Sequence, residues 1–598
     1  MSDTHILQPF DYLALLGYFA VLIFIGTYFR KYIKEAKDYF AAGASVPWWL
    51  ASISFWMASF SATFFVIYSQ IAFKYGLVAV VIAWVPIPAM VLAYFFFAVR
   101  WRRARVITPL GFISQRYNPL VHQVFVWTGF PLRLIDNALR ILATSIFLVP
   151  AIGQGWFSLD VCIFVVGSIM IIYAVLGGQW AVLVTDFFQF SILCIAVLFM
   201  FGLSLAAVGG FTGLVEGVKT GPEPPVNFFH PLTPPYDFFY WAMFAVVALL
   251  SYNASWGLVQ KYNCVPTEKD AKKVALGMGV LSFLGPLLFF FPALAARAYL
   301  PPLLGASVLN RSDEVYVLMA LKILPVGLMG ILVAGMFSAT LSTLGNEYNV
   351  LSGVLTKDFY HRVVRPEAGE RQLVRMGRVN TAFIGLLTTF FALGLKYLKE
   401  VFNLIDILVK IFGAFGPAIM IPLLAGLVLK KVNARGAIAG IVAGTISGVS
   451  LVVLNGILLA VYKERVATDP NLSYWLKQGW NSAAIGINVL ATLLGMWIGS
   501  LGYRPSEEEE KRVAEFINRM RFPSGAEPSL ERPRRSPFLI VGLALIAYGL
   551  ILLAVTALVA TRHAPPKTII LNGLASLAMI LLGLAMRQLS GRKKVAGS

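Results

Sequence analysis

Long apolar stretches, separated by short polar or charged segments, occupy this chain from Asp11 to Arg587. A helix of about 20 apolar residues is long enough to cross the hydrocarbon core of a bilayer. Windows of that length predict about fifteen spans, which lie near residues 11–29, 48–72, 77–99, 127–153, 159–177, 182–208, 238–260, 274–298, 324–356, 379–397, 402–429, 436–462, 482–502, 538–561 and 567–586. The pattern therefore predicts an all-α polytopic membrane protein.

Composition and charge narrow this prediction. Of the 598 residues, 58% are hydrophobic and 13% are charged, which is more apolar material than one soluble core can bury. The 49 Lys+Arg exceed the 29 Asp+Glu, and in a membrane protein such an excess reports loop topology rather than nucleic-acid binding. The three cysteines, Cys162, Cys194 and Cys264, are far apart and suggest neither a disulfide framework nor a metal site.

The basic residues also predict the orientation of the chain. If the N-terminus is outside, the cytoplasmic loops contain the clusters Arg30–Lys37, Arg100–Arg105, Lys269–Lys273, Arg362–Arg378 and Lys430–Arg435. The long loop at 209–237 then lies outside and has Lys219 as its only basic residue. By the positive-inside rule we expect a multi-pass protein of the plasma membrane with its N-terminus outside and its C-terminus in the cytoplasm.

Two predicted spans contain runs of small and polar residues, at 58–63 and 251–257. Irregular backbone is tolerated in the hydrocarbon region only where it lines a cavity or binds a ligand. The two runs are five spans apart, so their helices cross the bilayer in opposite directions, as the first helices of two inverted five-helix repeats would. Small residues can instead serve close helix packing, but the matched placement favours a binding site.

The ninth span carries hydroxyl side chains on one face. Ala339, Ser342 and Thr343 share that face through their i, i+3, i+4 spacing. Hydroxyl and freed carbonyl oxygens suit a hard cation such as sodium, which must be able to leave again. The alternative is that these hydroxyls bond back to carbonyls of their own helix.

Charged residues inside spans are costly, and each marks a functional site by default. Such residues are Asp136, Arg140, Asp186, Glu347, Asp406 and Lys410. Within this set, Asp136 with Arg140 and Asp406 with Lys410 have i, i+4 spacing, and each pair can simply neutralise itself.

Six motifs in chain order resemble the sodium/solute symporter family. They are DYFAAG at 38–43, TPLGF at 108–112, LGGQWAV at 176–182, VQKY at 259–262, the stretch 342–349 followed by KDFY at 357–360, and NARGA at 433–437. The resemblance spans roughly residues 10–500 and implies a LeuT-like core of 5+5 inverted repeats with extra N- and C-terminal helices. It also implies a sodium site made by the carbonyls of Met57, Phe60 and Ala339 and the hydroxyls of Ser342 and Thr343. Asp186 matches a family aspartate that supports a sodium path or a second site.

The resemblance says less about the solute. Sugar-transporting relatives have a glutamine and a glutamate where this chain has Phe64 and Ala83, so a hexose pocket is not expected. Arg140 lies near the position where sialic-acid-transporting relatives use an arginine for the substrate carboxylate. Glu347 can tune cation choice, carry a proton or contact a basic group. The predicted substrate residues are Arg140, Phe64, Asn253, Ser255, Lys410 and Glu347.

The boundaries of the predicted spans and loops divide the chain into seven parts. They are an N-terminal helix and loop at 1–46, a first repeat at 47–208, an extracellular loop at 209–237, a second repeat at 238–430, two peripheral helices at 431–502, a cytoplasmic loop at 503–536, and two C-terminal helices with a basic tail at 537–598. Within the cytoplasmic loop, Glu507 opens a predicted amphipathic helix that runs to Arg521.

The sequence thus predicts a sodium-coupled secondary active symporter that imports a small polar solute, which can be a carboxylate anion, by alternating access. The alternatives are sodium-coupled transport of a neutral sugar or other small solute, and a passive channel. No H-E-x-x-H or G-x-S-x-G motif occurs in the spans, so we do not expect an enzyme. The expected cofactor is Na+ alone, and the expected partners are the solute and the lipid bilayer but no nucleic acid.

Overall fold

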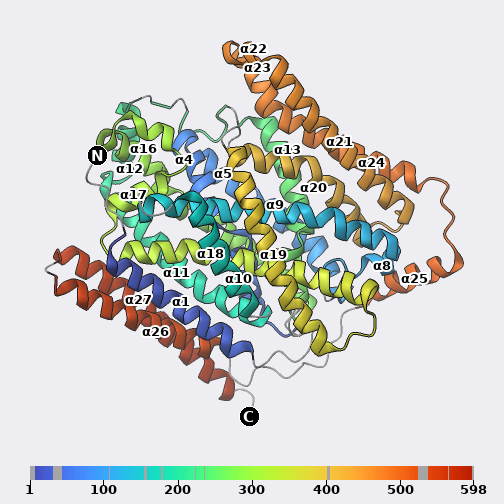
Figure 1. Cartoon of the computed structure of the whole chain (residues 1–598), viewed down its shortest axis with the longest axis horizontal. Coiled ribbons are helices and arrows are strands. Elements are labelled where there is room, and N and C mark those ends of the chain that lie inside the picture. Colours follow the sequence, from blue (N-terminus) through green and yellow to red (C-terminus); the bar gives the residue numbers. More distant parts are fainter. Residues whose placement is uncertain are drawn as a thin grey trace.

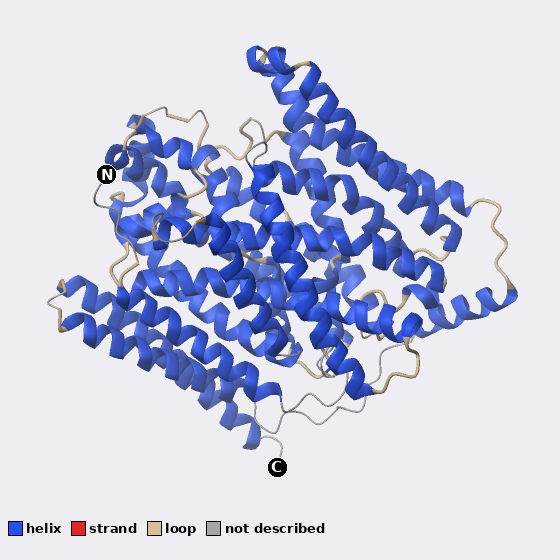
Figure 2. Ribbon diagram, viewed as in Figure 1, coloured by secondary structure: helices blue, strands red, loops and turns tan. Residues whose placement is uncertain are grey.

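A computed structural model describes residues 7–30, 44–106, 108–153, 158–176, 179–222, 224–225, 227–234, 236–399, 404–522, 537–562 and 564–595. This part of the chain is built from helices (Figure 2), and its one β-bridge joins Thr233 to Tyr236. The all-α prediction is confirmed.

The helices of the first half of the chain are α1 (Pro9–Arg30), α3 (Trp48–Ser59), η2 (Phe64–Tyr68), α4 (Ser69–Tyr75), α5 (Val78–Trp84), α6 (Pro86–Leu92), η3 (Ala93–Phe97), α7 (Ala98–Ala104), α8 (Ile113–Arg116), α9 (Pro119–Ile152), α10 (Leu159–Leu176), α11 (Gln179–Ala207), α12 (Gly210–Thr220), α13 (Phe238–Ala254), α14 (Trp256–Asn263) and α15 (Glu268–Phe289). Those of the second half are α16 (Phe291–Leu304), η4 (Ala306–Arg311), α17 (Val315–Ile323), α18 (Leu328–Gly353), η5 (Val354–Val364), α19 (Glu370–Lys399), α20 (Leu404–Val428), α21 (Ala434–Val461), α22 (Lys463–Thr468), α23 (Pro470–Tyr474), η6 (Trp475–Gly479), α24 (Trp480–Ser500), α25 (Glu507–Arg521), α26 (Pro537–Ala560) and α27 (Pro566–Val595).

Among the described residues, 12 helices are long and apolar enough to span a membrane, and two bent helix pairs raise that number to 14. A shorter apolar helix at Leu159–Val175 lies in the remaining predicted window. The polytopic architecture is therefore confirmed, whereas the count of about fifteen spans stays a prediction.

Both predicted helix breaks are present. The helix before the first break bends by 62° against the helix after it, and Phe60 between them has extended backbone at φ −114° and ψ 125°. At the second break the bend is 47°, and Ser255 is extended at φ −65° and ψ 124°. Each break frees backbone groups from helical hydrogen bonding, and these groups need other partners.

Helix α18 lies at the centre of the bundle (Figure 1), and every one of its residues is buried. It packs against α3, α9, α11 and α19. Its N-terminus is capped from another helix, because Asp11 Oδ1 of α1 accepts hydrogen bonds from the backbone N–H groups of Gly327 (2.7 Å) and Gly330 (2.9 Å). A carboxylate at a helix N-terminus satisfies these free donors and the helix dipole. The cap helps to fix the helix that carries the predicted sodium ligands.

The peripheral helices lie at opposite edges of the molecule (Figure 1). Helices α26 and α27 form a hairpin along α1, and α21 and α24 pack together at the other edge. The hairpin contacts the core through Asn572, whose amide donates to the carbonyl of Val326 at 2.7 Å. The hairpin thus contacts the chain just before α18, next to the glycine whose N–H donates to Asp11.

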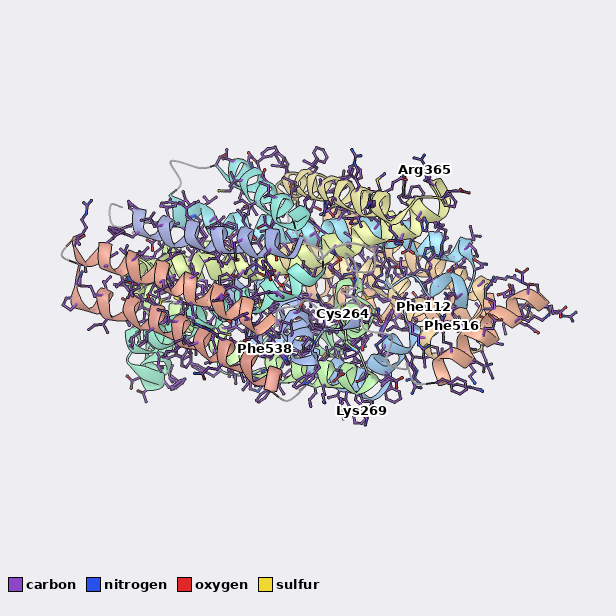
Figure 3. All side chains as sticks on the ribbon, turned by 90° about the horizontal axis from the view of Figure 1, so that it is seen from below. Phe112, Cys264, Lys269, Arg365, Phe516 and Phe538 are labelled. Atoms are coloured by element: carbon purple, nitrogen blue, oxygen red, sulfur yellow. The ribbon has the colours of Figure 1, made fainter. Side chains whose placement is uncertain are left out.

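The predicted amphipathic helix in the 503–536 loop is confirmed as α25. Ser506 caps it by accepting a hydrogen bond from the N–H of Glu509, and four glutamates occupy its first turn. Its one buried side chain, Phe516, stacks on Phe112 with ring centroids 5.9 Å apart (Figure 3). The helix is therefore anchored to the loop before α9 by an aromatic contact.

Candidate functional site

The first helix break faces the hydroxyl cluster of α18. Thr343 Oγ1 lies 2.7 Å from the carbonyl oxygen of Phe60, 3.1 Å from that of Met57 and 2.9 Å from that of Ala339. The backbone N–H of Ala62, freed by the break, donates to Thr340 Oγ1 at 3.0 Å. Four of the five predicted sodium residues therefore meet around one hydroxyl group.

This cluster has the chemistry of a sodium site. A threonine hydroxyl has one proton, yet three carbonyl oxygens lie within hydrogen-bonding distance of it. The cluster is therefore richer in oxygen lone pairs than in donors, and a hard cation can replace the missing protons. Neutral oxygens of this kind could hold a sodium ion, and their lack of net charge would permit its release.

The fifth predicted ligand, Ser342, faces a buried carboxylate. Its hydroxyl donates to Asp186 Oδ1 at 2.5 Å. Asp186 Oδ2 accepts from the hydroxyl of Ser54 and, at 3.2 Å, from the amide of Asn346. Asp186 is fully buried, so Ser342 is the link between the oxygen cluster and a carboxylate that can attract a cation.

Lys261 adds a buried cation next to this carboxylate. Its ammonium donates to Asn346 Oδ1, and the Asn346 amide donates to both Asp186 and the carbonyl oxygen of Ser342. Lys261 lies in α14, directly after the second break, within the VQKY motif. Sequence reasoning did not assign it a role, although it is a charged residue at the end of a predicted span.

A cavity of about 170 Å³ lies beside the cluster, between the two helix breaks. Its lining includes Ala58, Ser59 and Ser61 from the first break and Ser251, Tyr252 and Ser255 from the second. Side chains of α5, α6, α9, α13, α14, α18, α20 and α24 complete the wall. Cavities that bind small molecules combine apolar walls with a few placed polar groups, and this cavity has both.

Four charged side chains line this cavity in two pairs. Arg140 Nη2 lies 2.8 Å from Asp136 Oδ2, and Arg133 Nη1 lies 3.5 Å from Glu347 Oε1. Arg133 also donates to Ser255 Oγ at 2.7 Å, and its guanidinium lies over the ring of Trp256 at 5.8 Å. The second break therefore faces an arginine, whereas the first faces hydroxyl groups.

Sequence reasoning missed Arg133. The signal was present, because Arg133 and Arg140 are seven residues apart in one predicted helix and so lie on the same face. Only the position of the other helices decides that this face lines a cavity.

The predicted substrate residues divide into two groups. Arg140, Phe64, Ser255 and Glu347 line the cavity, as does Ala83, while Asn253 and Lys410 are not among its lining residues. Phe64 stacks on Phe60 and Tyr68 with centroid distances of 4.2 and 4.5 Å. The Asn253 amide donates to the carbonyls of Ala89 and Leu249, which is a packing role. The side chain of Asp406, the predicted partner of Lys410, lies outside the described residues.

Comparison with known proteins agrees with this geometry. The model of the sodium:solute symporter family matches residues 39–444. The chain is 25% identical over 452 residues to the sodium/sialic acid symporter NanT of Aliivibrio fischeri, covering 72% of this chain and 86% of that protein. It is 24% identical over 466 residues to a sodium/glucose cotransporter of Vibrio parahaemolyticus, covering 73% and 84% of the two chains.

A solved structure has the same fold. The outward-open, substrate-bound structure of a Na+-coupled sialic acid symporter superposes with a TM-score of 0.66 at 20% identity, covering 84% of this chain and 99% of that one. The family and these relatives are transporters rather than enzymes, with Na+ as the coupling ion and a small molecule as substrate. Because the family model matches more than half of its length, this chain belongs to the sodium:solute symporter family.

Proposed function

We propose that this chain imports a small polar solute bearing a carboxylate across the plasma membrane, driven by sodium and by alternating access. The observation that carries the proposal is the position of Arg140 in the wall of a cavity next to the Thr343 oxygen cluster. A guanidinium group recognises a carboxylate with two parallel hydrogen bonds. The inward sodium gradient supplies the free energy, to which the membrane potential adds about 2.3 kcal/mol per charge at 100 mV.

The roles of the residues follow from their chemistry. Met57, Phe60, Ala339, Ser342 and Thr343 would hold the sodium ion, with Asp186 on its path or at a second site. Phe60, whose carbonyl belongs to the oxygen cluster, stacks on Phe64, which lines the cavity. We therefore expect that filling one site changes the packing at the other. Such shared contacts are what couple two binding events.

A neutral solute is the second candidate. Asp136 lies 2.8 Å from Arg140 and can neutralise it without any ligand. A sugar or other neutral solute would then use the serine, tyrosine and charged side chains as hydrogen-bond partners. A passive channel is less well supported, since a binding site between two broken helices is typical of carriers.

The test is uptake into proteoliposomes that contain the full chain, with an inward sodium gradient and a panel of carboxylates, sugars, amino acids and vitamins. We expect one carboxylate-bearing solute to accumulate against its own gradient with sodium and not with potassium outside. Downhill flux alone, without accumulation, would identify a channel. Accumulation of a neutral solute only would favour the second candidate.

A further inference from the structure

The two acidic side chains of the cavity differ in how well they are paired. Asp136 makes a close ion pair with Arg140, at 2.8 Å. Glu347 lies 3.5 Å from Arg133, beyond the usual length of a charge-assisted hydrogen bond. Its other carboxylate oxygen, Oε2, has no hydrogen-bond partner among the described residues. The cavity therefore contains one satisfied and one unsatisfied carboxylate.

Because Glu347 is buried, the lack of a hydrogen-bond donor to its carboxylate costs free energy. Glu347 is only 3% exposed, in the wall of the cavity and one turn beyond Thr343 on α18. A buried anion is stable only when paired or fully hydrogen-bonded. Arg133 is engaged elsewhere, because it donates to Ser255 and lies over Trp256.

Lys261 does not donate a hydrogen bond to Glu347 either. Its ammonium donates to Asn346, whose amide in turn donates to Asp186. Arg133 and Lys261 thus both donate to other partners, and Glu347 is one of the residues that line the cavity where a solute would bind.

The backbone nearby leaves room for this carboxylate. A Cβ atom on Gly257, in α14, would lie 2.5 Å from Glu347 Oε1. Glycine at the start of the helix after the second break therefore allows Glu347 to reach the cavity wall. The carboxylate of Glu347, on α18, therefore occupies the space that a side chain at position 257 of α14 would fill.

We infer that the transported solute carries a protonated amine, which pairs with the Glu347 carboxylate, in addition to the carboxylate of the proposed function. An ammonium group supplies the missing donor and a second positive charge beside that of Arg133, whereas a neutral hydroxyl supplies only the donor. The cavity already holds two arginines and two acids, so a zwitterion leaves its charge balance unchanged and a simple anion does not. This inference rests on the proposed function.

The test uses the full chain in proteoliposomes and matched sets of probes. Each set contains an amino acid, its N-acetyl derivative and the acid without the amino group, and the amino acids include α-amino acids and the series from glycine to ε-aminocaproate. We expect sodium-driven uptake of an amine-bearing member and little uptake of its two counterparts. Glu347→Gln should weaken the apparent affinity for that member by about tenfold or more, while the sodium-induced rise in melting temperature is retained.

Glu314→Gln is the matched control, because Glu314 pairs with Arg311 outside the cavity, and it should behave like the wild type. Normal affinity in the Glu347→Gln variant would overturn the inference, as would sodium-driven uptake confined to solutes without an amine. Those results leave the proposed function intact if the solute has a carboxylate. Absence of any sodium-dependent uptake or sodium-induced stabilisation overturns the proposed function, and this inference with it.

Discussion

The two broken spans of this protein have the same kind of helix break, but different side chains face the two breaks. At the first break, the carbonyls of Met57 and Phe60 meet the hydroxyl of Thr343. At the second, Ser255 meets the guanidinium of Arg133, which in turn lies near Glu347. Neutral oxygens surround one break and charged groups surround the other.

The difference supports the different ligands that we propose for the two regions. A sodium ion can bind to neutral oxygens and leave them again, because no full charge holds it. A solute with charged groups is instead recognised by fixed opposite charges with directional hydrogen bonds. In the function that we propose, each helix break forms part of a binding site, and the side chains opposite the break select the ligand.

The largest effect is expected from Ser342→Ala combined with Thr343→Ala. Loss of two hydroxyl ligands should raise the sodium concentration for half-maximal uptake by about a hundredfold, at roughly 1.5 kcal/mol or more for each bond to a charge. Sodium titration of uptake measures this shift. Thr381→Val is a suitable control, because its hydroxyl bonds only to its own helix at Gly377. Unaltered sodium dependence in the double variant would remove the ion from the first break.

Arg140→Lys should act on the solute and leave sodium binding nearly unchanged. The substitution keeps the positive charge but removes the two-pronged geometry, so the affinity for a carboxylate solute should fall by about tenfold. Competition by matched carboxylates and neutral analogues measures the effect, and neutral solutes should lose little. If the true solute is transported normally by this variant, Arg140 is only the structural partner of Asp136.

Gly257→Ala should give a smaller effect at the second break. The new methyl group would meet Glu347 Oε1 at 2.5 Å and displace it, at a cost of roughly 1 to 2 kcal/mol. We expect solute affinity to fall several-fold, with the sodium titration unchanged. Gly279→Ala is the control, since its methyl group would meet only Met90 at 3.7 Å. An equal loss in both variants would indicate a general packing defect.

The orientation can be tested without any change in transport. We expect a tag before Ser2 to be accessible from outside the cell and a tag after Ser598 only from the cytoplasm. Accessibility of both tags from one side would mean that the span count is even and that one predicted window does not cross the membrane. The two breaks would then need a new assignment of direction.

Much of the site could be predicted from the sequence because its signals are local. Apolar windows predicted the helical bundle, and small polar runs predicted the breaks at Phe60 and Ser255. The hydroxyl pair at Ser342 and Thr343 was recognisable from helical spacing. These features depend on residues within one or two turns of each other, where the chain geometry is fixed.

Contacts between distant helices could not be predicted in this way. Asp11 caps α18, Ser342 donates to Asp186, and Arg133 faces Glu347. Asn253, predicted in the substrate site, instead bonds to backbone carbonyls. Helical periodicity says which residues share a face, but not which helix that face will meet.

The sequence by itself determined the class of protein, its broken helices and the hydroxyl cluster proposed to bind sodium, because hydrophobic length and helical period are local properties. The tertiary structure alone decided which charges share the cavity and which carboxylate has the longer ion pair. The physical reason is that a buried charge takes its energy from atoms a few ångströms away in space, and those atoms come from α9, α14 and α18 only once the helices have packed.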